Sequence, residues 1–328
     1  MKRNFSSSVF FPGFLFPGIV ARFCQHALTL FALLFLTVMA ALPSAARDEN
    51  GSKFEAKGAT IYYEVLGSGS GTPLMVANGG PGFDHTYLHV STAWESLAKN
   101  RKVVLYDQRG TGRSISSRKD QTYTLADQID DLDALRAHLG FDRIDLLGHS
   151  WGGFLAMAYA ARHSDRISHL ILVDSAAPQF KDTIFLFSNV FPEGVERQAA
   201  LTFNEEMGDN KARDADLREY LSMLFYSPEK RDAFLANVDT NVYQRDVNEA
   251  VNHDISRFDL NPEIRKFRFP VLVVTGRYDM NVAPLVAYKI HQSISGSRFA
   301  VFERSGHLPF YEEPEQFIRI TEEFLAAR

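Results

Sequence analysis

Between residues 59 and 175 of this 328-residue chain, short apolar runs alternate with amphipathic segments. In one amphipathic segment, residues 124–139, leucine or isoleucine recurs every three or four positions, which is the period of a helix. Near-continuous apolar strands separated by helices are typical of a parallel sheet covered on both faces. The sequence therefore predicts an α/β fold with a mostly parallel, doubly wound sheet. The expected strands are residues 59–65, 74–78, 103–106, 143–147 and 169–174.

The alternation is interrupted between residues 177 and 267, a stretch that is rich in charged helical segments and lacks strand-like runs. A stretch of roughly 90 residues is too long for a loop without structure of its own. The pattern resumes with apolar runs at residues 271–275 and 298–303 and ends with a helix near 314–327. We therefore expect residues 177–267 to form a helical cap inserted after the sixth core strand. Residues 47–176 and 268–328 are expected to form the two parts of the core.

Residues 1–46 are predicted to be a secretory signal peptide outside the fold. Their only charges are three basic side chains, and they contain an uncharged apolar run at residues 27–42. The run is followed by Pro-Ser-Ala-Ala, which suits cleavage after Ala46. It is shorter than the ~20 residues that span a bilayer. An uncleaved membrane anchor is the alternative, because the uncharged stretch also extends back to residue 23.

Charge and cysteine content exclude several classes of function. The formal net charge is −5, and cleavage after Ala46 would remove three basic charges and make it −8. Nucleic-acid binding needs clustered Lys and Arg, so nucleic acid is not an expected partner. The single cysteine, Cys24, excludes an intramolecular disulfide and a thiolate zinc site. We expect an exported protein of the periplasm or exterior, with membrane contact only if the N-terminal segment stays uncleaved.

The segment Gly148-His149-Ser150-Trp151-Gly152 lies between a predicted buried strand and a helix rich in small residues. A serine hydroxyl is a poor nucleophile unless it is well exposed, has a base in reach and faces donors for an oxyanion. A sharp turn from strand to helix exposes the hydroxyl, and glycines two residues before and after the serine relieve the crowding of that turn. The pattern predicts Ser150 as a catalytic nucleophile.

The base and the orienting acid are expected at the ends of later strands. His307 directly follows the last predicted strand, where a parallel sheet presents residues to a site. The other histidines lack such a setting: His149 is expected to point away from the site, and most of the rest are expected in solvent. Asp279 follows the strand at residues 271–275 and would hold the imidazole in the tautomer that attack by Ser150 requires. Asp174, at the end of the preceding strand, is the alternative acid.

Two donors to an oxyanion are also expected. The N–H of Trp151 directly follows the nucleophile. The second donor is expected from Gly79 or Gly80, in the glycine loop that follows an early strand. Glycine lets the backbone approach a substrate closely, although a plain turn would explain these glycines nearly as well.

The glycine loop at residues 79–82, the segment Asp-Gln-Arg-Gly-Thr-Gly-Arg-Ser at 107–114 and Gly-His-Ser-Trp-Gly-Gly at 148–153 together resemble the motifs of proline iminopeptidases. The resemblance covers nearly all of residues 59–328, but matches the cap only loosely. It implies the α/β-hydrolase fold, whose chain order is nucleophile, acid, histidine. It also implies removal of an N-terminal residue, often proline, by acyl transfer through a serine. The chain departs from the family at Asn78, where the family usually has histidine.

The resemblance also implies a site for the ammonium group of the substrate. Such a group calls for carboxylates in a largely dry pocket, and the relatives use cap glutamates. Residues 241–249 resemble the stretch that carries one of them, which makes Glu249 the first candidate and Glu219 the second. The alternative is that both are among the many solvated acids of the cap.

Two other functions stay open at this point. The same serine, histidine and aspartate would also suit an ester, lactone, amide or carbon–carbon substrate, because this fold hosts many chemistries. A hydrolase fold that only binds ligands is the third possibility. No cofactor or metal is predicted, since the sequence lacks H-E-x-x-H and its glycine runs lack the partners of nucleotide sites.

Overall fold

A computed structural model describes residues 51–117 and 123–327 of the chain. The predicted signal peptide and its cleavage point lie outside these residues. None of the helices formed by the described residues is both long enough and apolar enough to cross a membrane.

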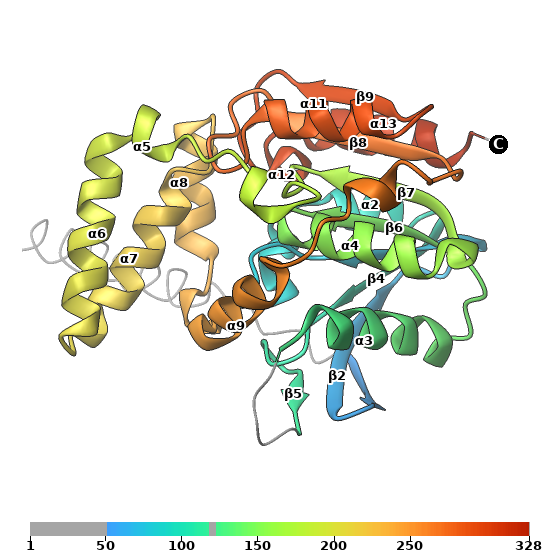
Figure 1. Cartoon of the computed structure of the whole chain (residues 1–328), viewed down its shortest axis with the longest axis horizontal. Helices are drawn as coiled ribbons and strands as arrows, with labels where there is room; N and C mark the ends of the chain where they lie inside the picture. Colours follow the sequence, from blue (N-terminus) through green and yellow to red (C-terminus); the bar gives the residue numbers. More distant parts are fainter. Residues whose placement is uncertain (1–50, 118–122, 328) are drawn as a thin grey trace, which may run out of the picture. The chain divides into compact units, whose positions relative to one another are not determined.

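The described residues form a nine-stranded sheet in the order β1-β2-β4-β3-β6-β7-β8-β9, with β5 paired to β2 (Figure 1). Strands β4, β3, β6, β7, β8 and β9 are parallel, and β2 pairs antiparallel with β1 and β4. The predicted, mostly parallel sheet is therefore confirmed. The strands are β1 (Ser52–Ala56), β2 (Ala59–Leu66), β3 (Gly71–Ala77), β4 (Arg101–Tyr106), β5 (Ile115–Ser116), β6 (Ile144–His149), β7 (Ile167–Val173), β8 (Val271–Gly276) and β9 (Arg298–Phe302).

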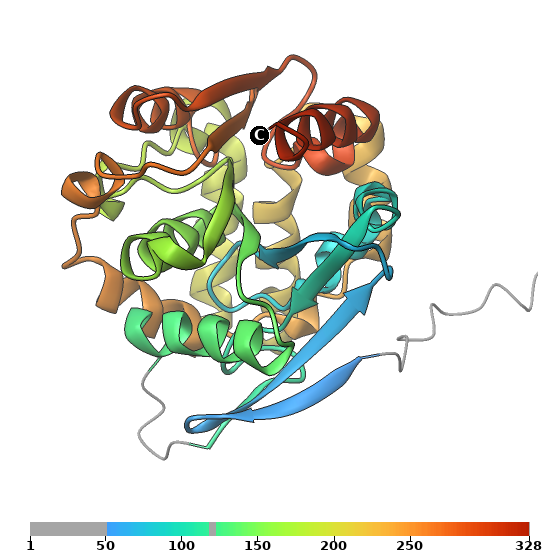
Figure 2. The same cartoon turned by 90° about the vertical axis from the view of Figure 1, so that its right-hand side faces the viewer.

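Helices cover both faces of the sheet (Figure 2). Every residue of the central strands β6 and β8 is buried, which explains their near-continuous apolar sequences. One apolar core includes residues of α3, α4 and α11, and a second core on the other face includes residues of α2, α12 and α13. The helices and turns of this part are η1 (His85–Val90), α2 (Ala93–Leu97), α3 (Leu125–His138), α4 (Trp151–Arg162), η2 (Ser164–Arg166), α11 (Pro284–Ser293), α12 (Pro309–Glu312) and α13 (Pro314–Leu325).

Between β7 and β8 the chain forms helices only, and we call residues 177–267 the insert. It follows β7, and the strands that precede it include β1 and the two-residue β5, which the sequence did not predict. Figure 1 shows α6, α7 and α8 side by side. The helices of the insert are η3 (Phe180–Asp182), α5 (Phe187–Val190), α6 (Pro192–Glu206), α7 (Asn210–Ser222), α8 (Pro228–Asn237), η4 (Thr240–Val242), α9 (Arg245–Ile255) and α10 (Asn261–Ile264).

The carboxyl ends of the parallel strands meet at one edge of the sheet. The segments that follow β3, β6, β7, β8 and β9 therefore leave the sheet at the same edge. These segments contain the glycine loop, Ser150, Asp174, Asp279 and His307, in that order. The topology thus brings together residues that lie more than 200 positions apart in the chain.

Candidate active site

Ser150 occupies a strained turn between β6 and α4. Its φ of 56° and ψ of −119° lie in a region that residues with a side chain rarely adopt. The turn also brings backbones close together: a Cβ atom on Gly148 would collide with the backbone of Gly152, and one on Gly152 with the carbonyl of Ala77. The predicted need for both glycines therefore has a direct steric cause. The strain presents Ser150 to a cavity at the strand ends.

His307 and Asp279 form a buried pair. His307 Nδ1 lies 2.7 Å from Asp279 Oδ2, and the other carboxylate oxygen accepts the backbone N–H groups of Asn281 and Val282 at 2.9 Å each. A carboxylate can only accept from Nδ1–H, so Nε2 of a neutral His307 carries the lone pair. The side-chain amide of Asn281 lies 3.2 Å from this Nε2. His307 and Ser150 line the same small cavity of about 40 Å³.

Asp174, the alternative acid, lies beside this pair rather than in it. Its carboxylate oxygens are within 4.8 Å of the ligand atoms of Asp279 and His307. Burial, and then the negative charge of Asp279, hold the pKa of Asp174 well above its usual range. Its Oδ1 accepts the N–H of Gly276 at 2.9 Å. Of the two aspartates, it is Asp279 that contacts His307.

Two backbone N–H groups near Ser150, those of Gly80 and Trp151, lack a hydrogen-bond acceptor among the described residues. The N–H of Gly79 donates to the hydroxyl of Tyr87 at 2.7 Å and is therefore occupied. The Gly80 N–H has no hydrogen-bond acceptor within the described part of the chain, and Gly80 adjoins Ser150 in the wall of the cavity. Trp151 is the first residue of α4, where backbone N–H groups have no partner within the helix. Gly80, rather than Gly79, therefore has a free N–H that can donate to an oxyanion.

Side chains of two predicted motifs hold the glycine loop in place. The amide group of Asn78 donates to the carbonyl of Phe83 at 3.0 Å. Gln108, from the motif at 107–114, donates to the carbonyl of Asn78 at 2.9 Å and accepts from the indole N–H of Trp151 at 2.8 Å. These bonds connect the glycine loop to the turn that holds Ser150. Asn78 keeps a hydrogen-bonding role where the family has histidine.

His149 contradicts the expectation that it points away from the site. Its ring centroid lies 4.8 Å from that of His307, and its Nε2 lies 2.8 Å from the backbone carbonyl of His307. Burial, and then the proximity of His307, hold the pKa of His149 well below its usual range. A neutral ring that donates from Nε2 must accept at Nδ1, where the hydroxyl of Tyr87 lies 2.7 Å away. Gly79, Tyr87, His149 and His307 are therefore joined by one chain of hydrogen bonds.

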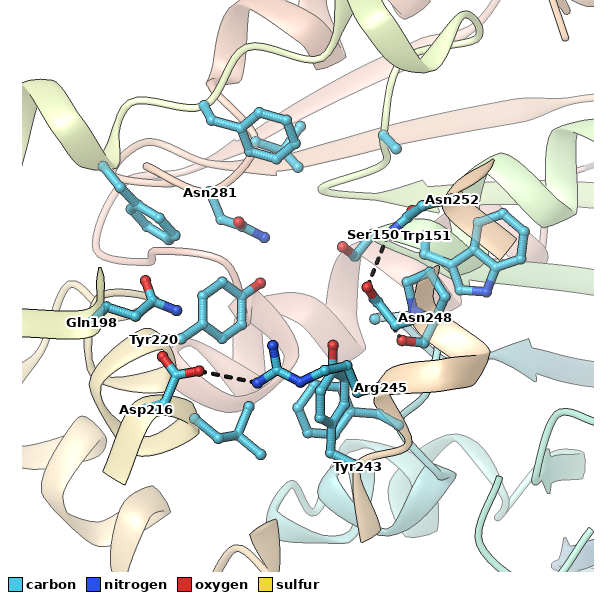
Figure 3. A pocket seen from close by; sticks show the side chains of 18 of the residues that line it. Ser150, Trp151, Gln198, Asp216, Tyr220, Tyr243, Arg245, Asn248, Asn252 and Asn281 are labelled. Carbon is cyan, nitrogen blue, oxygen red and sulfur yellow. Dashed lines mark hydrogen bonds and ion pairs between the residues drawn. The ribbon is translucent and has the colours of Figure 1, made fainter. Parts of the chain in front are cut away.

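A larger cavity of about 530 Å³ opens beside Ser150 and is walled mainly by the insert (Figure 3). Asp216 on α7 is the one carboxylate among its described lining residues. The Nη2 of Arg245 lies 3.3 Å from Asp216 Oδ2 and 2.6 Å from Glu205 Oε2. The second oxygen of Asp216 and the Nε of Arg245 are buried without a hydrogen-bond partner in the described residues. The wall also contains the guanidinium of Arg213 and the polar side chains of Thr183, Ser188, Gln198, Thr202, Tyr220, Tyr243, Asn248, Asn252 and Asn281.

A family model described as alpha/beta hydrolase fold matches residues 72–314. The chain belongs to this family. This hydrolase is 31% identical over 285 residues to a proline iminopeptidase of Clostridium botulinum, covering 80% of this chain and 94% of that protein. It is 32% identical over 286 residues to one of Saccharolobus solfataricus, covering 82% and 89%. The resemblance to proline iminopeptidases is thereby confirmed.

Solved structures support the fold of this hydrolase. An esterase from Exiguobacterium antarcticum matches with a TM-score of 0.68 at 24% identity, over 84% of this chain and 100% of that one. The enol-lactonase from Burkholderia xenovorans LB400 matches with a TM-score of 0.67 at 24% identity over the same shares. At this identity the likeness establishes the fold, not the substrate.

The structure does not bring the two cap glutamates of the hydrolase into the cavity. Glu249 is exposed on α9, and Glu219 on α7 pairs with Arg197 at 2.9 Å. Neither belongs to the lining, whereas their helix neighbours Asp216 and Asn248 do. Adjacent helix positions point about 100° apart, so Glu249 and Asn248 face different ways, whereas Glu219 points about 60° away from Asp216, three positions earlier. A search for polar residues four apart, such as Asn248 and Asn252, would have indicated the inward face.

Proposed function

We propose that this α/β hydrolase is a serine aminopeptidase that acts through an acyl-enzyme on Ser150. The observation that carries this proposal is the buried contact of 2.7 Å between His307 Nδ1 and Asp279 Oδ2. This contact leaves the Nε2 of a neutral His307 able to accept a proton, and His307 lines the same small cavity as Ser150. Relatives named proline iminopeptidases support the choice of a peptide substrate.

In the proposed reaction, Ser150 Oγ attacks the carbonyl carbon of the first peptide bond while His307 Nε2 accepts the hydroxyl proton. The carbonyl oxygen becomes negatively charged and accepts hydrogen bonds from the Gly80 and Trp151 N–H groups. Collapse breaks the C–N bond, and His307 gives its proton to the leaving amine. Water, deprotonated by the same imidazole, then releases the first residue and restores Ser150. Asp279 stabilises the imidazolium formed in each step.

We propose that Asp216, rather than Glu249 or Glu219, accepts the ammonium group of the substrate. Its second carboxylate oxygen is buried without a hydrogen-bond partner among the described residues, and such a group costs free energy until a donor contacts it. A substrate ammonium would supply that donor within the cavity that contains Ser150. The aromatic rings of Tyr220 and Tyr243 in the same wall would pack against an apolar first residue such as proline.

An ester or lactone hydrolase is the second candidate. Arg245 favours it, because the guanidinium partly neutralises Asp216 and its buried Nε has no acceptor in the described residues. A substrate that offers oxygen atoms and no amine would satisfy that donor. The esterase and the enol-lactonase share only the fold and do not add to this argument.

The two candidates are separated by hydrolysis of prolyl anilide, its N-blocked form and a short-chain ester. For the aminopeptidase we expect the free anilide to be the best substrate and Asp216→Asn to lower its kcat/KM by about tenfold to a hundredfold, in line with loss of a charge-assisted hydrogen bond. Glu219→Gln, on the same helix outside the cavity, is the matched control and should keep full activity.

Ser150→Ala should abolish hydrolysis of every substrate while leaving the melting temperature nearly unchanged. Equal rates on free and N-blocked anilides would contradict the aminopeptidase and favour the ester candidate. Full activity of Ser150→Ala would contradict both.

A further inference from the structure

A second group of ionisable side chains lies apart from the cavities of the active site, where β2 meets η1. Glu64 stands between two imidazoles: its Oε1 is 3.1 Å from His85 Nε2, and its Oε2 is 2.9 Å from His89 Nε2. One ligand atom from each of the three residues lies within 4.8 Å of the others. None of the three lines either cavity beside Ser150.

We propose that Glu64, His85 and His89 bind a divalent transition metal, with Zn²⁺ as the ion that fits best. Two imidazoles and one carboxylate are a ligand set that holds Zn²⁺ and leaves a fourth position for water. Bonds of about 2.1 Å in a tetrahedral site place neighbouring ligand atoms roughly 3.4 Å apart. Each imidazole contacts a different oxygen of Glu64, and one ligand atom of each residue lies within 4.8 Å of the others, so a small movement of the side chains would admit the ion.

His85 has the environment of a metal ligand. Its side chain is completely buried, and its Nε2 has no hydrogen-bond partner of good geometry in the described residues. Its Nδ1 lies 2.5 Å from Asp107 Oδ1. A histidine that binds a metal through one ring nitrogen usually donates from the other nitrogen to a carboxylate, which orients the ring. His85 is therefore not among the histidines that lie in solvent.

The neighbours of Glu64 orient its carboxylate. Its Oε1 accepts from the hydroxyl of Tyr62 at 2.9 Å and from Arg113 Nη2 at 3.0 Å, which leaves Oε2 facing His89. With both imidazoles neutral, as metal binding requires, the carboxylates of Glu64 and Asp107 outweigh the one positive charge of Arg113 and leave a negative charge for the ion to neutralise. The side chain of His89 is 36% exposed and lies on the path to solvent.

The position of the cluster indicates a structural role for the ion. Glu64 belongs to β2, whereas His85 and His89 belong to η1, which follows the loop containing Gly80. The ion would tie these segments together without contacting Ser150. Binding to the folded state alone raises the melting temperature, and this readout does not depend on activity.

The experiment is titration of the full chain, freed of metal with EDTA, with ZnCl₂ and separately with MgCl₂. We expect one Zn²⁺ per chain and no binding of Mg²⁺, which prefers oxygen ligands. His89→Ala should weaken Zn²⁺ binding at least tenfold and abolish the rise in melting temperature. His253→Ala, which removes an exposed histidine from α9, is the matched control and should bind like the unaltered chain.

His89 is the residue to change because replacing His85 would leave Asp107 buried without its partner. Glu64→Gln gives a second variant that keeps the side-chain shape and removes the charge, and it should also bind Zn²⁺ more weakly. Ser150→Ala should bind Zn²⁺ normally. Absence of stoichiometric binding, or equal affinities of His89→Ala and His253→Ala, would overturn the proposal.

Discussion

Two aspartates at neighbouring strand ends of this hydrolase have different surroundings. Asp279 accepts hydrogen bonds from two backbone N–H groups and lies 2.7 Å from the imidazole Nδ1 of His307. Asp174 accepts from the N–H of Gly276, and burial together with the charge of Asp279 raises its pKa. Two carboxyl groups this close cannot both ionise freely, so only one of them can stabilise an imidazolium.

This difference predicts unequal effects of removing each charge. Asp279→Asn should lower kcat by roughly 10⁴-fold, because an amide in this position favours the wrong tautomer of the histidine. Asp174→Asn should lower kcat by less than about tenfold, since it replaces one uncharged group by another of the same shape. Steady-state kinetics of both variants on the same substrate would test this, and an equal loss in Asp174→Asn would show that the two carboxyl groups share the task.

At the scale of elements, Glu312 of α12 joins the insert to the loop of His307. One carboxylate oxygen accepts the N–H groups of Tyr226 and Ser227 in the insert, at 3.0 and 2.9 Å. The other accepts the N–H of Gly306 at 2.6 Å. Burial outweighs these hydrogen bonds and raises the pKa of Glu312 from 4.5 to about 7. The connection between the two segments is therefore sensitive to pH.

The direction in which pH changes the free energy of unfolding follows from proton binding to Glu312. Between about pH 4.5 and 7 the folded chain keeps a proton on Glu312 that the unfolded chain has lost, so the free energy of unfolding falls as the pH rises through this window. The full effect is about 3 kcal/mol, at 1.36 kcal/mol per pKa unit. Urea unfolding of the unaltered chain and of Glu312→Gln at pH 5 and pH 8 would measure it. We expect the unaltered chain to lose about 3 kcal/mol more than the variant over this range, and parallel profiles would contradict the prediction.

At the scale of the whole molecule, the proposed hydrolase combines a core that presents the strand ends with an insert that walls the cavity above Ser150. The predicted export of this molecule depends on residues 1–46, outside the described residues. We expect protein recovered from the periplasm or the medium of a bacterial host to begin at Arg47. Intact-mass measurement would check this, and a full-length chain in the membrane fraction would favour the anchor.

The sequence by itself indicated seven of the nine strands, the place of the insert and the residues of the turn at Ser150, but it did not indicate β1 or β5. Two local signals allowed this: the period at which apolar residues recur, and the presence of glycine at crowded positions. Both are local because backbone geometry and solvent act on a few neighbouring residues at a time. It also indicated His307 and Asp279, since the ends of parallel strands meet at one edge whatever the loops contain.

Only the tertiary structure decided which polar side chains of the insert enter the cavity. Asp216 and Glu219 lie three positions apart on α7, and one lines the cavity while the other pairs with Arg197. That choice depends on how each helix is rotated about its axis, which is set by packing between distant segments. The same holds for His85 and Glu64: their contact results from the folding of η1 against β2, and no spacing along the chain could have revealed it.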